Sequence, residues 1–201
     1  MNNTLIDPCI RTILGDGEQL VLSLPGVMAA CANDIPNRQA ASFPALRAHQ
    51  APAFHAFLAQ ICAMGLRRLG RSTLPGANED AWREVFRVLT KEFPNDEPWH
   101  LVSPPEVPAL LQPPVPGGDF SNFSDVRSPD GIDLLITSKQ HDMKEGAIAN
   151  AQSDDWFFAL VSVQTQDGYA GGAGGYQGVA RMNSGTGSRS YLHLAPDTGF
   201  A

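Results

Sequence analysis

The sequence has few cysteines and no long apolar run, and these absences exclude several classes of protein. Cys9, Cys31 and Cys62 are odd in number, lie far apart and form no CxxC pair. This pattern argues against a disulfide framework or a structural zinc site, and it suits the cytosol. No stretch approaches the ~20 apolar residues of a membrane helix, and Asp7 and Arg11 interrupt any run typical of a signal peptide. We therefore expect a cytoplasmic protein without a bound metal.

The motifs of several enzyme classes are also missing. A P-loop needs Gly-Lys-Ser/Thr, but no lysine follows Lys144. The dinucleotide fingerprint needs a strand before its glycines, whereas the glycine-rich stretch here follows a helical pattern. His49 and His55 are six residues apart and do not share a helix face, and no GxSxG or HExxH pattern occurs. We therefore expect a protein that is not an enzyme and has no cofactor.

Composition indicates a folded but acidic protein. Of its 201 residues, 43% are hydrophobic and 17% are charged, which is typical of a globular chain. The net charge is −7, so any contact with nucleic acid has to come from a local patch or from partner chains. Eight of the sixteen prolines lie between Pro94 and Pro116. They predict an irregular segment over residues 94–129, named here the proline-rich segment.

Hydrophobic patterns predict a mixed α+β fold. Gly15-Asp16-Gly17 between two apolar runs indicates a hairpin of two short strands. Capping residues and apolar periodicity indicate helices over Pro25–Ala32, Pro52–Leu69, Glu79–Lys91 and Asp154–Gln164. We expect Ser23 to cap the first of these helices, Asn78 the third and Ser153 the fourth. The pattern over residues 131–137 fits a strand or the start of a helix equally well.

Residues 168–187 contain eight of the nineteen glycines. Such a run can adopt positive φ angles and bring bare backbone close to another molecule. Residues 168–201 carry a net charge of +1, against −8 for the chain before them. A flexible, slightly basic loop suggests contact with phosphates or a nucleic-acid groove. A surface loop without a ligand is the alternative interpretation.

A second polar stretch, residues 138–150, precedes the last predicted helix. Its side chains include Lys139, Gln140, Lys144 and Asn150, which can hydrogen-bond phosphates or base edges. A solvated helix face is the alternative. The helix that follows leads directly into the glycine-rich stretch, so one scaffold element would hold two candidate binding loops.

Several segments together resemble one family, the large subunit (CasA) of the type I-E CRISPR Cascade complex. No single piece is a specific motif, but their order and number make a chance match improbable. The segments are LIDP (5–8), LSLP (22–25), SFPALRAHQ (42–50), AFHAFLAQ (53–60), FPNDEPWHLV (93–102), LQPPVP (111–116), DLLITSKQHDMK (133–144), DDWFFALVSVQTQ (154–166) and ARMNSG (180–185).

The resemblance implies a non-catalytic, DNA-sensing subunit of a crRNA-guided complex. Such subunits recognise the protospacer-adjacent motif in duplex DNA, help to start R-loop formation and recruit a helicase–nuclease. It also implies the α+β fold of the family's N-terminal domain. The family chain is much longer, so residues 1–201 are expected to be its N-terminal part, without the C-terminal helical bundle. A fragment and a chain completed by another polypeptide both remain open.

The resemblance also implies the residues that contact DNA. The family's glycine loop enters the minor groove beside the motif, and its upstream loop contributes to motif recognition. Some members bind zinc through paired cysteines in the upstream loop; this chain has none there, so no zinc is expected. The implied contacts are Gly171, Gly172, Gly174, Gly175 and Arg181 in the glycine-rich stretch, and Lys139, Gln140, Lys144 and Asn150 upstream.

Two other classes of function remain as alternatives. The glycine-rich stretch could cradle phosphates in a nucleotide-binding enzyme, although the missing lysine speaks against this. The chain could instead be a protein–protein scaffold whose working surface includes Trp82, Phe86 and the proline-rich segment.

Overall fold

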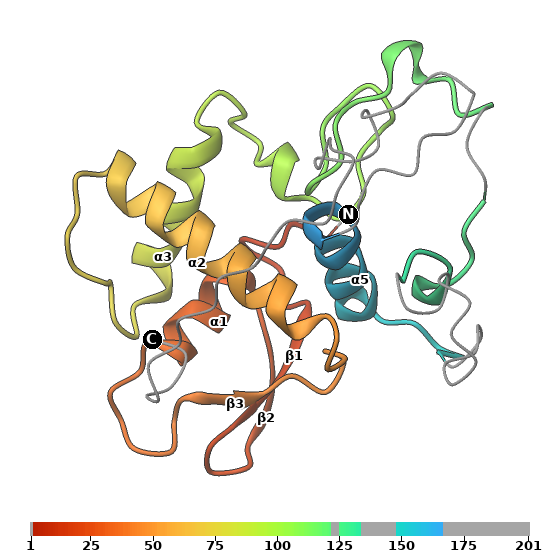
Figure 1. The fold of residues 1–201 in the computed structure, drawn as a ribbon. Coiled ribbons are helices and arrows are strands. Elements are labelled where there is room, and N and C mark those ends of the chain that lie inside the picture. The colour runs from red at the N-terminus through yellow and green to blue at the C-terminus, as the bar shows by residue number, and fades with distance from the viewer. Residues whose placement is uncertain (1, 122–124, 134–147, 167–201) are drawn as a thin grey trace.

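The computed structural model describes residues 2–121, 125–133 and 148–166 (Figure 1). Within them the chain forms four α-helices and one three-stranded antiparallel sheet of order β2-β1-β3, which confirms the expected α+β class. No helix in these residues is long and apolar enough to cross a membrane. The elements are β1 (Ile10–Leu14), β2 (Gln19–Leu22), α1 (Leu24–Cys31), β3 (Ala40–Ser42), α2 (Ala51–Arg68), α3 (Glu79–Arg87) and α5 (Ser153–Gln166).

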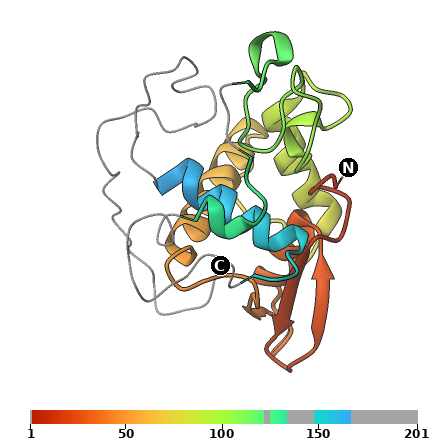
Figure 2. The same ribbon diagram turned by 90° about the vertical axis from the view of Figure 1, so that its right-hand side faces the viewer.

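The predicted hairpin is confirmed. Gly17 closes the turn between β1 and β2 with a φ angle of 87°, a value that favours glycine. The β1 side chains alternate, so Ile10, Thr12 and Leu14 are buried against the helices. The register pairs Ile10 with Leu22 and Thr12 with Leu20, which places Ile10, Leu20 and Leu22 on the same face of the hairpin. Figure 2 shows the hairpin extending away from the helical part of the molecule.

The helix boundaries follow local signals. Ser23 caps α1 by accepting a 3.0 Å hydrogen bond from the Gly26 amide, and Asn78 caps α3 through the Ala81 amide, also at 3.0 Å. Both predicted caps are therefore confirmed. The predicted helix over 79–91 is slightly too long, because α3 ends at Arg87 and the chain tightens into a 3₁₀ turn over Val88–Thr90.

The core is built on aromatic rings from α2 and α5, which contact each other in the fold. Phe54 of α2 is fully buried and meets Phe158 at 4.9 Å, Phe43 at 5.3 Å and Phe157 at 6.0 Å between ring centroids. All three pairs are edge-on, the arrangement that aromatic quadrupoles favour. This packing fixes α5 against the long helix α2.

A second aromatic group joins the proline-rich segment to α3. Trp99 stacks on Phe86 of α3 with centroids 5.6 Å apart, and Phe86 contacts Trp82 at 6.3 Å. The indole N–H groups are satisfied, since Trp99 donates to Thr90 Oγ1 and Trp82 donates to the Gly76 carbonyl, both at 2.8 Å. The start of the proline-rich segment is therefore packed on the core.

Gly65 of α2 permits the close approach of α3. A Cβ at this position would overlap the Val85 carbonyl oxygen and lie 2.7 Å from Val85 Cγ1. In an open helix, Gly→Ala raises stability by about 1 kcal/mol. Here we expect Gly65→Ala to lower it by about 2 kcal/mol because of overpacking, measured by urea unfolding. Ala63→Gly, on the exposed side of α2, is the control, because it measures the difference in helix propensity between alanine and glycine without a packing change. A Gly65→Ala variant that is more stable than the unmodified chain would contradict this packing.

Asp96 is a buried carboxylate that accepts hydrogen bonds from Arg87 and Asn3. Burial disfavours its charge, but hydrogen bonds from Arg87 (2.6 Å) and Asn3 (3.1 Å) outweigh burial and hold the pKa of Asp96 below its usual range. A lowered folded-state pKa gives stability that is present at neutral pH and is lost as pH falls through that pKa.

We therefore expect Asp96→Asn to lower the unfolding free energy by about 2 kcal/mol at neutral pH. The difference in unfolding free energy between the variant and the unmodified chain should be constant above about pH 5 and shrink below about pH 4. Asparagine tolerates the left-handed backbone of this residue (φ 60°), so the variant isolates the charge. Urea unfolding at a series of pH values measures this difference. If the difference stays constant to the lowest pH at which the chain folds, the ion pair contributes nothing to stability.

Candidate functional site

Only one of the implied DNA contacts lies within the described residues. Asn150 is exposed and sits in a bend shortly before α5. Its carboxamide is therefore available to a partner. The other eight, Lys139, Gln140, Lys144, Gly171, Gly172, Gly174, Gly175 and Arg181, lie outside the described residues.

Two buried carboxylates fasten the chain on both sides of residues 134–147. Asp130 and Asp133 are 0% and 1% exposed, and Arg47 bridges them at 2.5 Å and 3.0 Å. Asp130 Oδ2 also accepts a 3.1 Å hydrogen bond from the Ile148 amide. Because Asp130 precedes residues 134–147 and Ile148 follows them, one ionic cluster holds the described chain on both sides of that range.

The residues just before α2 complete this cluster. Gln50 donates to Asp133 Oδ2 at 2.8 Å, and His49 Nε2 lies 2.7 Å from Asp133 Oδ1. His49 therefore serves the cluster as a partner of a carboxylate, in line with the absence of a metal-ligand spacing in the sequence. Buried carboxylates need several such partners, because an uncompensated buried charge is costly.

The N-terminus of α5 is tied to the sheet by a second ion pair. Asp154 is 1% exposed and accepts from the Arg11 guanidinium at 2.8 Å and from the Arg11 amide at 3.0 Å. Arg11 lies beyond the part of β1 that β3 covers, so its amide would otherwise lack a strand partner. Hydrogen bonding to Asp154 is the main cause of a raised pKa of Arg11.

The predicted Ser153 cap is wrong. Ser153 is the first helical residue, and Asp155 satisfies the helix start by accepting a 2.7 Å hydrogen bond from the Gln152 amide. The Ser153 hydroxyl instead accepts a 2.7 Å hydrogen bond from Asn2. The Asp155 carboxylate also lies in the first turn, where the helix dipole stabilises a negative charge.

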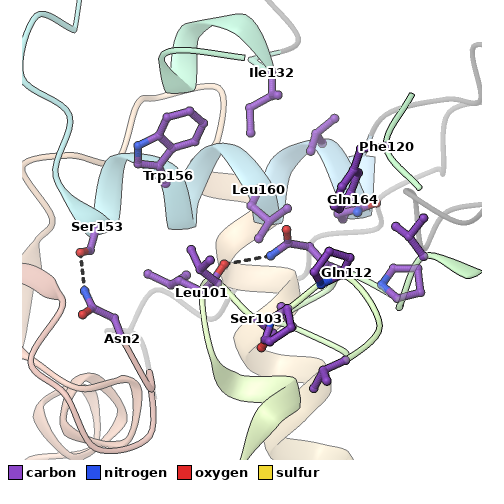
Figure 3. A pocket seen from close by; sticks show the side chains of 18 of the residues that line it. Asn2, Leu101, Ser103, Gln112, Phe120, Ile132, Ser153, Trp156, Leu160 and Gln164 are labelled. Atoms are coloured by element: carbon purple, nitrogen blue, oxygen red, sulfur yellow. Dashed lines mark hydrogen bonds between the residues drawn. The ribbon is translucent and has the colours of Figure 1, made fainter. Parts of the chain in front are cut away.

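A cavity of about 1130 Å³ lies between α5 and the proline-rich segment (Figure 3). It is named here the α5 cavity. Trp156, Leu160 and Gln164 line it from α5, and Leu101 and Gln112 line it from the facing segment. The apolar residues of α5 serve two surroundings, because Phe157 and Phe158 pack in the core and Trp156 and Leu160 border the cavity.

Hydrogen bonds hold the two walls of the α5 cavity together. Gln164 of α5 donates to the Leu111 carbonyl at 2.8 Å. Gln112 donates to the Leu101 carbonyl at 3.1 Å, which joins two stretches of the proline-rich segment to each other. These bonds fix the described walls of the cavity relative to each other.

The described cysteines are poor candidates for chemistry. Cys9, Cys31 and Cys62 are all buried, free thiols. Burial raises the pKa of each thiol to about 12, with acidic neighbours adding to the effect at Cys9. A protonated, buried thiol is a weak nucleophile. Within the described ranges, no group of three or more His, Cys, Asp or Glu residues could hold a metal ion.

Sequence reasoning missed the cluster of Arg47, Asp130 and Asp133. The pairs span more than eighty residues, and nothing local marks Arg47 as their partner. One signal was present, since Asp130 and Asp133 are two acidic residues in an otherwise apolar and turn-forming stretch. An acidic residue beside a predicted buried run requires a partner.

No family model, no curated protein and no solved structure matches this sequence. Its function therefore has to be inferred from its residues and their geometry.

Arg47→Gln should destabilise the chain strongly, because it removes a cation that pairs with two buried carboxylates. We expect the free energy of unfolding, measured in urea, to fall by about 3–5 kcal/mol. Arg38→Gln is the matched control, since Arg38 pairs with Asp16 and Glu18 at the surface. Its loss should be much smaller, because water screens an ion pair at the surface. Equal losses in the two variants would show that the Arg47 cluster is no stronger than a surface ion pair.

Proposed function

We propose that this chain is the N-terminal part of a Cascade large subunit of type I-E. In this role it is a non-catalytic, cytoplasmic component of a crRNA-guided complex for antiviral defence. It recognises the protospacer-adjacent motif in double-stranded DNA, helps to start R-loop formation and supports recruitment of the helicase–nuclease. Its partners are the other Cascade subunits, the crRNA and the target duplex. This proposal is supported by the ordered series of segments, from Leu5 to Gly185, that resemble segments of the family.

The geometric observation that best supports it is the fixed position of α5 between the two candidate loops. The helix starts three residues after Asn150 and ends at Gln166, just before the glycine-rich stretch. Arg11 fixes its N-terminus to β1, and Phe157 and Phe158 fix its side to α2. A rigid connector of this kind gives two binding loops a constant spacing, which recognition of a short motif requires.

The chemistry of the minor groove fits a glycine-rich contact. The groove is narrow and presents mainly acceptors and the guanine amino group. In the proposed complex, backbone around Gly172 and Gly174 enters the groove because no side chain obstructs it. Lys139, Lys144 and Asn150 then contact phosphates or base edges from the upstream loop.

An acidic chain can serve this function because base pairing with the crRNA reads the long target sequence. The protein then has to read only a short motif, as in other RNA-guided systems. With a net charge of −7, the chain gains little from non-specific attraction to DNA. Partner subunits and RNA supply most of the positive surface in this proposal.

The test replaces Gly172 and Gly174 with valine in the assembled complex. We expect duplex containing the motif to bind about tenfold more weakly or worse, since added side chains keep the loop out of the groove. Binding of a single-stranded target should be unchanged, because it pairs with the crRNA without reading the motif. Gel shift on duplexes that differ only in the motif measures the effect.

Ala173→Gly is the matched control, because it changes the same loop without adding bulk. It should bind duplex as the unmodified complex does. If the valine variants also bind duplex normally, the glycine-rich stretch has no groove contact and the proposed function is wrong in its main feature.

The scaffold alternative requires revision. Trp82 and Phe86 are 0% exposed and pack inside the core, so they cannot form the surface that this hypothesis assigned to them. The proline-rich segment does border the α5 cavity. The nucleotide-binding enzyme is a weaker hypothesis, which binding of a fluorescent nucleotide to the isolated chain would support.

A further inference from the structure

We infer that a basic surface at the end of α2 binds the phosphate backbone of duplex DNA without reading its sequence. The inference takes its partner from the proposed function, but it concerns residues that were not assigned to DNA above. The basic surface consists of five exposed cationic side chains from the end of α2, the chain just after it and the end of α3 with the turn that follows: Arg67, Arg68, Arg71, Arg87 and Lys91.

The sequence around the end of α2 lacks carboxylates. Residues 35–78 contain five arginines and no Asp or Glu, although acidic residues outnumber Lys and Arg in the whole chain by 21 to 14. Arg38 and Arg47 pair with carboxylates in other segments. Arg67 and Lys91, in contrast, are exposed and have no hydrogen bond or ion pair with any described residue. Their charges are therefore available to a partner.

A Schellman motif fixes the end of α2. The Arg71 amide donates to the Leu66 carbonyl at 2.9 Å, and the Gly70 amide donates to the Arg67 carbonyl at 3.1 Å. Gly70 has a φ angle of 65°, the left-handed conformation that this motif requires. Because the backbone closes on itself here, its three arginines leave the chain at set positions.

Arg68 joins the end of α2 to the 3₁₀ turn that follows α3 (Figure 1). Its guanidinium donates to the carbonyl oxygens of Val88 and Leu89, at 3.2 Å and 2.8 Å. These two residues lie between Arg87 and Lys91 in the chain. The cations of the two elements are therefore brought close together.

The local charge is positive on an acidic protein. Glu84 and Asp96 each pair with one of the cations, at 3.2 Å and 2.6 Å, and Glu92 is a third carboxylate beside them in the sequence. Five cations against these three carboxylates leave a net charge of +2, whereas the whole chain carries −7. Such a surface attracts a polyanion at one place on a protein that otherwise repels it.

The residue types favour phosphate over the carboxylates of an acidic protein. The exposed residues over 67–73 are arginine, glycine, serine and threonine. Arginine, serine and threonine commonly contact phosphate oxygens, and one guanidinium can bind two of these oxygens at once. Apart from the partly buried Leu69, this stretch has none of the apolar and aromatic residues that form the core of a protein interface. A duplex presents phosphates at short, regular intervals, so each cation can meet one.

The test measures binding of the 201-residue chain to a fluorescently labelled DNA duplex that lacks the adjacent motif, by fluorescence anisotropy at a series of salt concentrations. We expect the double variant Arg67→Gln/Lys91→Gln to bind about tenfold more weakly at low salt, because two phosphate contacts are lost. The slope of log affinity against log salt should become shallower by about 2. Since neither side chain has a partner in the described fold, unfolding of the variant in urea should match that of the unmodified chain.

The double variant Arg38→Gln/Arg127→Gln is the matched control, since it changes the net charge by the same amount at positions outside the basic surface. It should keep the affinity and the salt slope of the unmodified chain. The inference is wrong if the unmodified chain does not bind duplex at low salt, or if the control loses as much affinity as Arg67→Gln/Lys91→Gln. It is also wrong if polyglutamate competes as well as unlabelled duplex, which would assign the surface to an acidic protein.

The glycine variants separate this inference from the proposed function. Gly172→Val with Gly174→Val should leave binding of the motif-free duplex unchanged. If this variant loses that binding, the binding belongs to the glycine-rich stretch and the basic surface has no role. If the motif test on the assembled complex fails while the dependence on Arg67 and Lys91 remains, the proposed function is wrong and the basic surface stands.

Discussion

Arginine side chains that reach buried aspartates across the sequence are the constraint on which this fold depends. Arg11 pairs with Asp154 over 143 residues, and Arg47 pairs with Asp130 over 83 residues. Among the described residues the sheet has three short strands, and none of them pairs with α5 or with residues 125–133, so side-chain contacts hold these parts. Ion pairs that bury a carboxylate are specific, because a misplaced partner leaves a desolvated charge. They therefore define where these distant segments attach.

The regular elements could be predicted because their signals are local. A cap residue, a turn glycine and a helical apolar stripe all act within a few positions, as Ser23 and Gly17 show. Their failures are local too. At the start of α5 the Asp155 carboxylate accepts from the Gln152 amide, whereas the Ser153 hydroxyl accepts from Asn2, a residue 151 positions away in the chain. Propensity ranks both residues as good caps and cannot order them.

The candidate site could be predicted only in part, because its determinants are tertiary. The α5 cavity needs Trp156 and Leu101 on facing walls, although fifty-five residues separate them in the chain. Proline content predicted that the segment would be irregular, but it could not predict that Trp99 stacks on Phe86 and fixes one wall. A helix with apolar residues on two sides reads in sequence as one broad face. Its division between core and cavity depends on the elements that cover it.

Helix α5 combines these features in one element. Its first turn carries the carboxylate that docks on Arg11, one flank supplies Phe157 to the core, and the other supplies Trp156 to the cavity. The helix is therefore held at its start by an ion pair and along one flank by aromatic packing. In the proposed function, this fixed helix connects the two segments of the chain that bind DNA, so the same contacts that complete the core also set the distance between those segments.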